Sequence, residues 1–284
     1  MDELKELDPE IETGLWSYIP RHDALPQIMG ILNVTPDSFS DGGRFFSMDQ
    51  AVAHGLKMAE EGADIIDIGG ESTRPGSDPV PPDEQIKRVC PVIAKIFRST
   101  DVPISIDTSS SIVAREALSA GAAIINNVSA LRFDEEMVNL VAEKEVGLIL
   151  MHMKGSPKDM QKNPHYDNLI KEVFDFLEER AIIAERAGVL SSRIVIDPGI
   201  GFGKTLEGNI ELIKNIPYFR ELGYPVLIGA SRKAFIGKIT GREVDDRLAG
   251  SLAINCICAL NGVDILRVHD VKETMDALKI IFHF

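Results

Sequence analysis

The sequence predicts an α/β protein with a single (β/α)8 TIM barrel, and three observations carry this prediction. Eight short apolar runs recur along the 284 residues, segments with helical periodicity separate them, and no linker rich in Pro, Gly or Ser divides the chain. Short buried strands that alternate with helices are typical of a parallel sheet, and eight such units in about 250 residues are typical of a closed barrel. An open, doubly wound sheet is the alternative.

The predicted strands are short apolar runs, rich in Ile, Val and Leu. They cover Gln27–Leu32, Asp64–Ile68, Pro103–Ile106, Ala123–Ile125, Gly147–Leu150, Ile194–Ile196, Val226–Ile228 and Asp264–Leu266. Between them, apolar residues recur at helical spacing, most clearly in Met48–Glu61 and Leu169–Ala187. Glycines suited to a helix C-terminus follow several such segments, at Gly62, Gly121, Gly188, Gly223 and Gly262.

The net charge narrows the possible partners. The chain has 30 Lys and Arg against 44 Asp and Glu, a formal net charge of −14. This excludes binding of nucleic acid or of an anionic membrane over a broad basic surface. The longest uncharged stretch, Leu248–Val263, is too short and too polar for a membrane span, and no apolar leader precedes the barrel. We therefore expect a cytoplasmic protein with neither nucleic-acid nor membrane partners.

The first 26 residues differ from the rest of the chain. Seven acidic and two basic residues there account for −5 of the net charge. We predict an acidic N-terminal arm over residues 1–26 and one barrel domain over residues 27–284. The three cysteines, Cys90, Cys256 and Cys258, are too few for a disulfide framework and are expected to be packing residues.

Reactive groups of such barrels lie on the loops that follow the carboxyl ends of the strands. Polar or glycine-rich residues follow every predicted strand, in Asn33–Asp41, Gly69–Gly76, Asp107–Thr108, Asn126–Asn127, Met151–Met153, Asp197–Lys204, Ser231–Lys233 and Arg267–His269. A single Asp after a strand is commonly a helix N-cap. Eight polar loops on one rim instead predict a ligand site.

Two kinds of chemistry separate by residue type. The first group combines anionic acceptors, an amide and a cation, which suit a flat heterocycle with a pterin-like or purine-like edge. Its residues are Asp107, Asn126, Asp197 and Lys233. Donors, cations and one neutral oxygen suit phosphate oxygens with Mg²⁺, and these are Asn33, Thr73, Arg74, Arg267 and His269.

The motifs that carry these residues resemble those of the dihydropteroate synthase family of bacterial folate biosynthesis. In order from Met29 to Val271 they are MGILNVTPDSFSDGG, DIIDIGGESTRPG, SIDTS, IINN, LMHMKG, IDPGIGFGK, GASRK and RVHDV. The resemblance implies a transferase that joins 6-hydroxymethyl-7,8-dihydropterin pyrophosphate to p-aminobenzoate, with release of pyrophosphate. It also implies Mg²⁺ as cofactor and a homodimer. The ordinary spacing of the residues in Thr35–Phe39 and Arg74–Gly76 predicts inhibition by p-aminobenzoate analogues such as sulfonamides.

The resemblance also implies roles for individual residues. The pterin site would comprise Asp107, Asn126, Val128, Met151, Asp197, Phe202 and Lys233. The pyrophosphate site would comprise Asn33, Thr73, Arg74, Arg267 and His269, with Asn33 as the Mg²⁺ ligand. The p-aminobenzoate site would comprise Phe39, Pro75, Phe202, Lys233 and Ala234. The catalytic residues would be Lys233, Arg267, His269 and Asp41, the last stabilising the cation left when pyrophosphate departs first.

Four residues near these motifs receive other interpretations. Asn127 stands where many relatives have Asp, and alternation along the strand turns it away from Asn126, so we expect it to support a loop. Ala234 replaces a frequent Ser and keeps only the backbone donor. His152 fits either a packed, hydrogen-bonded core histidine or a catalytic one and is not assigned to the site, and Lys204 is expected to be a solvated lysine on the rim.

Two other functions remain as alternatives. A pterin-dependent methyltransferase would need a corrinoid protein partner and no pyrophosphate pocket, which Arg74, Arg267 and His269 argue against. A non-catalytic pterin-binding paralogue would keep the fold and lose site residues, whereas Asn33, Asp107, Asp197 and Lys233 are all present.

Overall fold

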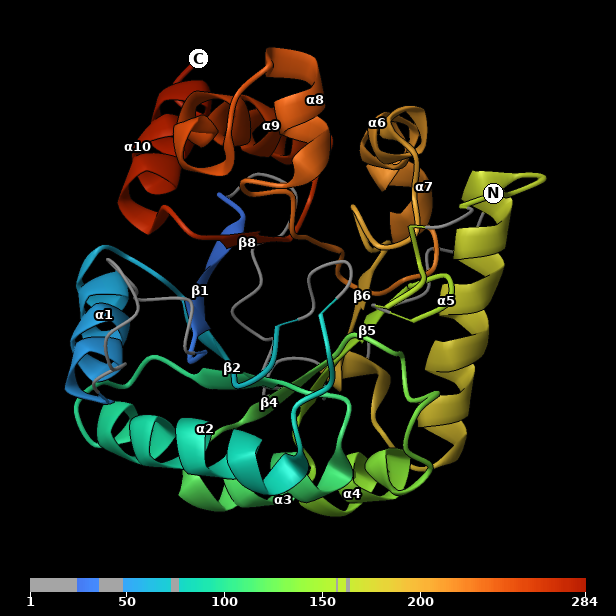
Figure 1. Cartoon of the computed structure of the whole chain (residues 1–284). Helices are drawn as coiled ribbons and strands as arrows, with labels where there is room; N and C mark the ends of the chain where they lie inside the picture. Colours follow the sequence, from blue (N-terminus) through green and yellow to red (C-terminus); the bar gives the residue numbers. More distant parts are fainter. Residues whose placement is uncertain (1–24, 36–47, 73–76, 157, 162–163) are drawn as a thin grey trace, which may run out of the picture.

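The computed structural model describes residues 25–35, 48–72, 77–156, 158–161 and 164–284 (Figure 1). Within these residues eight strands line the centre of the molecule. They are β1 (Gln27–Asn33), β2 (Ile65–Gly69), β3 (Ile104–Asp107), β4 (Ile124–Asn127), β5 (Gly147–Met151), β6 (Ile194–Asp197), β7 (Leu227–Ile228) and β8 (Ile265–Val268). Each lies where a strand was predicted, within a few residues at either end.

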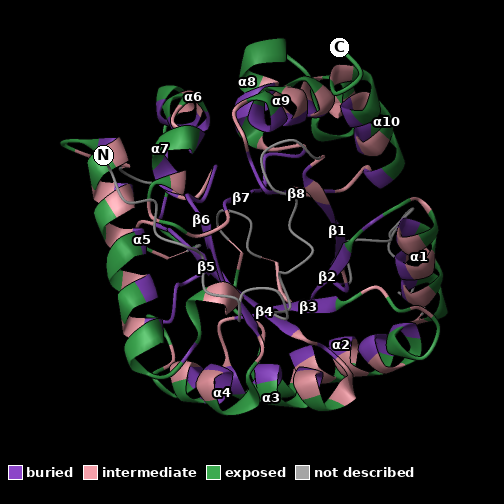
Figure 2. Cartoon of the chain, turned by 180° about the vertical axis from the view of Figure 1, so that it is seen from behind, coloured by how far each residue is buried: buried purple, intermediate pink, exposed green. Residues whose placement is uncertain are grey.

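The helices of the described residues surround the strands. They are α1 (Met48–Glu60), α2 (Pro82–Phe97), α3 (Ser111–Ala120), α4 (Glu136–Lys144), α5 (Leu169–Arg186), α6 (Leu206–Lys214), α7 (Ile216–Arg220), α8 (Ala234–Thr240), α9 (Leu248–Leu260) and α10 (Val271–Ile281). Their exposed residues face outward, and their buried residues face the strands (Figure 2). The predicted Gly121 ends α3, because its φ of 118° is open to glycine and strained for other residues.

The strands form one parallel barrel. Neighbouring strands pair in the order β6, β5, β4, β3, β2, β1, β8, β7. A parallel bridge between Ile196 of β6 and Val226, which precedes β7, closes the ring. Sequential pairing with closure confirms the TIM barrel and excludes the doubly wound alternative, in which the strand order reverses.

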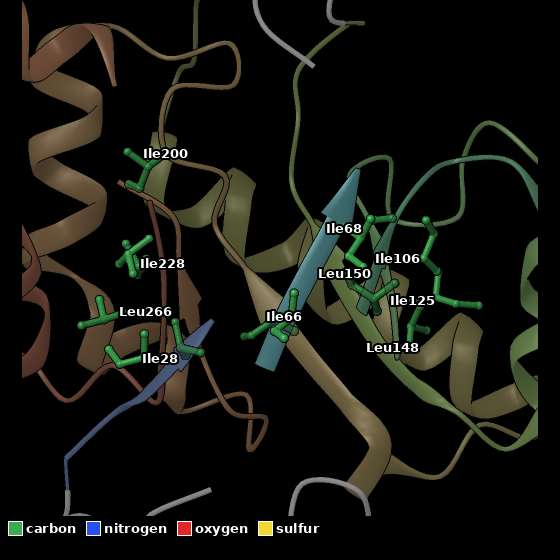
Figure 3. Close-up of a cluster of buried hydrophobic side chains, with 14 of the residues drawn as sticks. Ile28, Ile66, Ile68, Ile106, Ile125, Leu148, Leu150, Ile200, Ile228 and Leu266 are labelled. Carbon is green, nitrogen blue, oxygen red and sulfur yellow. The ribbon is translucent and has the colours of Figure 1, made fainter. Parts of the chain in front are cut away.

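Two apolar layers fix the barrel. The first lies between strands and helices, where outward residues such as Ile28, Ile66, Leu150 and Leu266 pack with the helices (Figure 3). The second plugs the barrel interior and comprises Met29, Ile65, Ile124, Ile149, Val195, Leu227 and Ile265. Because side chains alternate along a strand, the next inward positions toward the carboxyl ends hold other residues, and most of these are polar. This arrangement positions the site on top of the plug.

Three further expectations concern the N-terminal arm, membrane-spanning helices and the cysteines. Almost all of the predicted acidic arm, residues 1–24, lies outside the described residues. Over the described part of the chain, no helix is both long and apolar enough to cross a membrane. The three cysteines are free thiols, with Cys258 buried.

Candidate active site

The polar layer above the apolar plug is built from the last inward residue of several strands. Asp107 of β3 pairs in register with Asn126 of β4, and Met151 of β5 pairs with Asp197 of β6. Asp107, Asn126 and Asp197 are each buried, with 4–7% of their surface exposed. The strand register therefore brings together residues that lie up to 90 positions apart in the sequence.

Arg267 of β8 reaches across this layer to two carboxylates. Its Nε donates to Asp67 Oδ2 at 2.6 Å, and its Nη2 donates to Asp107 Oδ2 at 2.8 Å. Asn126 Nδ2 donates to the same Asp67 oxygen at 3.1 Å. Asp67 thus fixes the side chains of both Arg267 and Asn126.

Asp67 is the site residue that sequence reasoning missed. It lies in β2, is fully buried, and was counted within an apolar strand. The signal was available, because a charged residue between Ile66 and Ile68 in a buried strand needs a partner. Alternation along the strand, with Ile66 in the outer core, places Asp67 toward the barrel interior, where Arg267 supplies that partner.

Both carboxylates retain a free acceptor. Oδ1 of Asp67 and Oδ1 of Asp107 have no hydrogen-bond partner among the described residues. Burial raises the pKa of Asp107 to about 7, with Arg267 opposing the shift and Asp67 reinforcing it. A buried acceptor without a donor is costly, which suits a group that receives an N–H from a ligand.

Asp197 occupies the opposite side of the layer, at the end of β6. Its Oδ1 accepts a hydrogen bond from the backbone N–H of Gly199 at 2.7 Å. Burial raises the pKa of Asp197, and the nearby Lys233 opposes this shift. The turn after β6 therefore orients the carboxylate through its own backbone.

Lys233 precedes α8 and leans over the same turn. Its Nζ donates to the carbonyl of Ile200 and lies 4.4 Å from the centre of the Phe202 ring. Burial lowers the pKa of Lys233 to about 8, with Asp197 opposing the shift. Phe202 in turn packs on an apolar cluster that comprises Val128, Met151, Met153 and Met160. The apolar walls predicted for a pterin, Val128, Met151 and Phe202, therefore adjoin one another beside Lys233.

The remaining described candidates also lie on this rim. Asn33 ends β1 beside Gly69, where a Cβ would stand 3.6 Å from both Asn33 Oδ1 and Asp107 Cβ. The His269 ring follows β8, with Nδ1 3.1 Å from Ser231 Oγ. Ala234 is the exposed first residue of α8. Phe39, Asp41, Thr73, Arg74 and Pro75 lie outside the described residues, so their roles stay predictions.

Two of the secondary interpretations agree with the structure. Asn127 points away from the barrel interior and its Oδ1 accepts hydrogen bonds from Ser129 N, Ser129 Oγ and Leu131 N. It supports the loop after β4, as expected. His152 is buried and its ring meets Phe176 edge to face, with centroids 4.8 Å apart.

The prediction for Lys204 was wrong. Only 3% of its surface is exposed, so it is a buried lysine and not a solvated one. Its ammonium group contacts backbone carbonyls of its own turn and of the loop after β5. The sequence gives its position after a glycine-rich turn but not that the turn folds around it.

Among the described residues, a hard metal ion would need oxygens from a ligand as well as from the protein. No group of three or more His, Cys, Asp or Glu side chains in the described ranges could bind a metal ion. Mg²⁺, however, commonly uses one or two protein oxygens together with substrate phosphates and water. The side-chain oxygen of Asn33, at the carboxyl end of β1, fits such a set.

Comparison with known proteins gives the family. Residues 29–269 match the family model described as pterin binding enzyme. Dihydropteroate synthase of Haemophilus influenzae is 45% identical over 90% of this chain and 93% of that protein. Dihydropteroate synthase of Neisseria meningitidis serogroup C is 49% identical over 89% of this chain and 91% of that protein. The fold and the buried polar layer thus belong to a pterin-binding barrel enzyme.

Solved structures agree. The Xanthomonas albilineans dihydropteroate synthase with 4-aminobenzoic acid has a TM-score of 0.85 and 50% identity, covering 90% of this chain and 92% of that one. The Yersinia pestis dihydropteroate synthase in complex with a sulfonamide drug has a TM-score of 0.87 and 42% identity, with coverage of 90% and 93%. The chain belongs to the dihydropteroate synthase family, whose members are transferases.

Proposed function

We propose that the chain condenses 6-hydroxymethyl-7,8-dihydropterin pyrophosphate with p-aminobenzoate, giving 7,8-dihydropteroate and pyrophosphate in folate biosynthesis. The observation that carries this proposal is the buried polar layer, in which the strand register places the Asp107 and Asp197 carboxylates and the Asn126 amide at one end of the barrel, with Met151 of the apolar cluster paired to Asp197. The pterin-dependent methyltransferase and the non-catalytic paralogue are not favoured, because relatives that are 44–45% identical over about 90% of the chain are dihydropteroate synthases.

The pterin would bind between the two carboxylates. Asp107 Oδ1 has no donor within the described residues and would accept an N–H of the pterin edge. Asp197 would accept a second N–H, Asn126 would bind the edge between them, and Lys233 would donate to a pterin acceptor. Val128, Met151 and Phe202 would supply the apolar walls.

The leaving pyrophosphate would lie over β1 and β8. Arg267 and His269 would bind its oxygens, together with Thr73 and Arg74 from the loop after β2. Asn33 would hold Mg²⁺, which when bound neutralises charge on the pyrophosphate. Arg267 contacts Asp107 in this structure. The guanidinium group of Arg267 would therefore lie between the pterin half and the pyrophosphate half of the first substrate.

The second substrate would approach from the side of the turn after β6. Phe202 and Lys233 would contact p-aminobenzoate from the described residues, with the backbone N–H of Ala234 donating to its carboxylate. Phe39 and Pro75 would complete this site. The Xanthomonas albilineans relative has been solved with 4-aminobenzoic acid and, separately, with 7,8-dihydropteroate.

The reaction balances without a covalent enzyme intermediate. The C–O bond between the pterin methylene and pyrophosphate breaks, a C–N bond to the arylamine forms, and the amine loses one proton to solvent. The dihydropterin can delocalise the positive charge on its methylene, so departure can precede attack, and Asp41 would stabilise that cation. Fixed charges around the reacting carbon would supply most of the acceleration.

We further propose that the enzyme acts in the cytoplasm as a homodimer. Residues 1–26 would form an acidic arm beside the barrel domain of residues 27–284. Light scattering on the purified full chain tests the dimer, since a mass near 31.2 kDa would show a monomer.

The decisive experiment is an assay of pyrophosphate release. We expect release over many turnovers only when the dihydropterin pyrophosphate, Mg²⁺ and p-aminobenzoate are all present, with dihydropteroate as the other product, because departure without the arylamine can release pyrophosphate only once per active site. A sulfonamide added to the complete reaction should compete with p-aminobenzoate. Release no faster than without protein would contradict the proposed activity.

A binding measurement tests the residue assignment separately. Replacing Asp197 by Ala should weaken pterin binding by about 100-fold, equivalent to about 3 kcal/mol. The exposed Asp167→Ala variant serves as the control. If Asp197→Ala bound the pterin as tightly as the parent chain, the pocket would be misassigned while the activity could still stand.

A further inference from the structure

Lys204 is a buried lysine whose ammonium group is surrounded by polar atoms. Its Nζ lies 2.8 Å from His152 Nδ1 and 2.9–3.3 Å from four backbone carbonyl oxygens. Three of these carbonyls, from Pro198, Gly199 and Phe202, belong to the turn that begins after β6 and ends at Lys204 itself. The fourth is the carbonyl of His152, on the loop after β5.

The carbonyls converge because the turn is tightly wound. Gly199 and Gly203 have φ values of 73° and 67°, which few other residues adopt. A Cβ on Gly199 would stand 1.9 Å from the carbonyl oxygen of His152, so the two loops touch backbone to backbone. Carbonyl dipoles that point at one centre repel one another unless a cation or donor occupies that centre.

His152 completes the cage as an acceptor. Its imidazole is buried, and burial together with the adjacent Lys204 lowers its pKa well below 6.5, so the ring is neutral. Burial also lowers the pKa of Lys204, whereas Asp197 and the surrounding acceptors favour its protonated form. A neutral ring that accepts at Nδ1 carries its proton on Nε2. This gives a physical role to the His of the LMHMKG motif, which the reaction itself does not use.

The far side of the same turn contacts the substrate-binding groups. The carbonyl of Ile200 accepts from Lys233 Nζ, and the Phe202 ring lies under that ammonium group. A Cβ on Gly201 would stand 2.9 Å from Lys233 Cδ. One face of the turn therefore encloses Lys204, and the other sets the place of Phe202 and Lys233.

We propose that Lys204 is a positioning residue: its ammonium group gathers the carbonyls of the Pro198–Lys204 turn, and so places Phe202 and Lys233 for the arylamine substrate. This inference rests on the proposed function for its kinetic consequence. Its structural part, the ordering of the turn by a buried ammonium group, stands independently. Lys204 itself touches neither substrate.

The kinetic test compares substitution of the buried Lys204 with substitution of the exposed Lys214, ten residues further along the chain. Lys204→Met should raise the KM for p-aminobenzoate by about tenfold or more, because small displacements of contacting groups are costly. The KM for the pterin pyrophosphate should also rise, because Asp197, Phe202 and Lys233 belong to its site, but by less than the KM for p-aminobenzoate, because Asp107 and Asn126 lie on other strands. Lys214→Met, at an exposed position of α6, should leave both unchanged. Equal kinetics in Lys204→Met and Lys214→Met would overturn the proposal.

Chemical rescue separates positioning from a general loss of structure. In Lys204→Ala, propylammonium should restore the KM for p-aminobenzoate toward the parent value, because its N–H groups can enter the cage. Tetramethylammonium has the same charge and no N–H donor, and should not rescue. If both ions or neither restored the KM, Lys204 would not act through donation to the carbonyls.

Hydrogen exchange tests the turn without reference to activity. Amides of residues 198–204 should exchange about tenfold faster in Lys204→Met than in the parent chain, while those of α6 stay protected. Should Lys204→Met fail to fold, His152→Leu removes one acceptor, keeps the ammonium group, and should give the same local effect at smaller size. An inactive parent chain would contradict the proposed function alone, whereas unchanged exchange in residues 198–204 would contradict the role of Lys204.

Discussion

Two sides of the barrel rim hold buried charge in different ways. On the ion-paired side, formed by β2, β3, β4 and β8, Arg267 neutralises Asp67 and Asp107 through side chains. On the carbonyl-held side, formed by the loops after β5, β6 and β7, Lys204 and Lys233 donate to backbone carbonyls. The first arrangement depends on strand register and the second on the shape of one turn.

The difference shows what each side can tolerate. Removing one partner from the ion-paired side leaves a buried charge without its counter-charge, which is costly for the whole fold. Removing Lys204 from the carbonyl-held side leaves hydrogen-bond acceptors that are neutral, so the damage should be local to the turn. Global stability and local positioning are therefore the two quantities that distinguish the sides.

The largest effect is expected for Arg267→Met. Two buried carboxylates would then face each other without a cation, and the free energy of unfolding should fall by about 3–5 kcal/mol at pH 8. Because Arg267 holds down the pKa of Asp107, that pKa would rise further in the folded variant, so the loss is fully present above it and shrinks as the pH falls toward 5.5. Urea denaturation at both pH values measures this.

The matched control is Arg115→Met, which removes an exposed ion pair to Glu143 at 3.7 Å. Exposed pairs contribute less than about 1 kcal/mol, with little dependence between these pH values. An Arg267→Met variant no less stable than Arg115→Met would show that the ion-paired side does not depend on its cation. The activity of Arg267→Met should also fall by about 100-fold or more, since the pyrophosphate loses a donor.

The second prediction assigns one limb of the pH profile to each side. Asp107 must be ionised to accept from the pterin, so kcat/KM should rise as the pH increases through about 7. Lys233 must be protonated to donate, so kcat/KM should fall as the pH increases through about 8. The optimum should therefore be narrow and lie between these values.

Substitution of Lys233 should change only the alkaline limb of the pH profile, and substitution of Asp107 only the acid limb. Lys233→Arg keeps the charge up to high pH, and the alkaline limb should disappear below pH 9.5 while the acid limb stays near 7. Asp107→Asn should lower activity and remove the acid limb. A profile whose alkaline limb is unchanged in Lys233→Arg would assign that limb to another group.

The two sides also differ in how far the sequence predicts them. All eight strands and the order of the barrel follow from apolar runs separated by helical periodicity. Asp107, Asn126 and Arg267 were selected because they end strands, and the register does bring them to one layer. Asp67 was overlooked, although its charge inside a buried strand could have identified it.

The burial of Lys204 on the carbonyl-held side was beyond sequence reasoning for a physical reason. Whether Lys204 is solvated or buried depends on the directions of the carbonyl groups of Pro198, Gly199 and Phe202. The direction of a backbone carbonyl cannot be inferred from the residue type that carries it. Glycines indicate that a turn is tight but not toward which side chain it closes. Prediction from residue types therefore works where side chains pair with side chains, and fails where the backbone is the partner.

The smallest effect is expected at Asn127, which lies on the ion-paired side but whose side-chain oxygen accepts hydrogen bonds from backbone N–H groups. Asn127→Asp keeps the oxygen that accepts from Ser129 N and Leu131 N, and loses only the long 3.4 Å bond to the Thr108 carbonyl. We expect kcat/KM to change by less than about threefold and the free energy of unfolding by about 1 kcal/mol. Asn127→Ala, which orphans all these donors, should lower the free energy of unfolding by about 2–3 kcal/mol with a similar kcat/KM. A large kinetic defect in Asn127→Asp would instead mean that Asn127 contacts substrate, and the division of β4 into an inward binding residue and an outward supporting residue would fail.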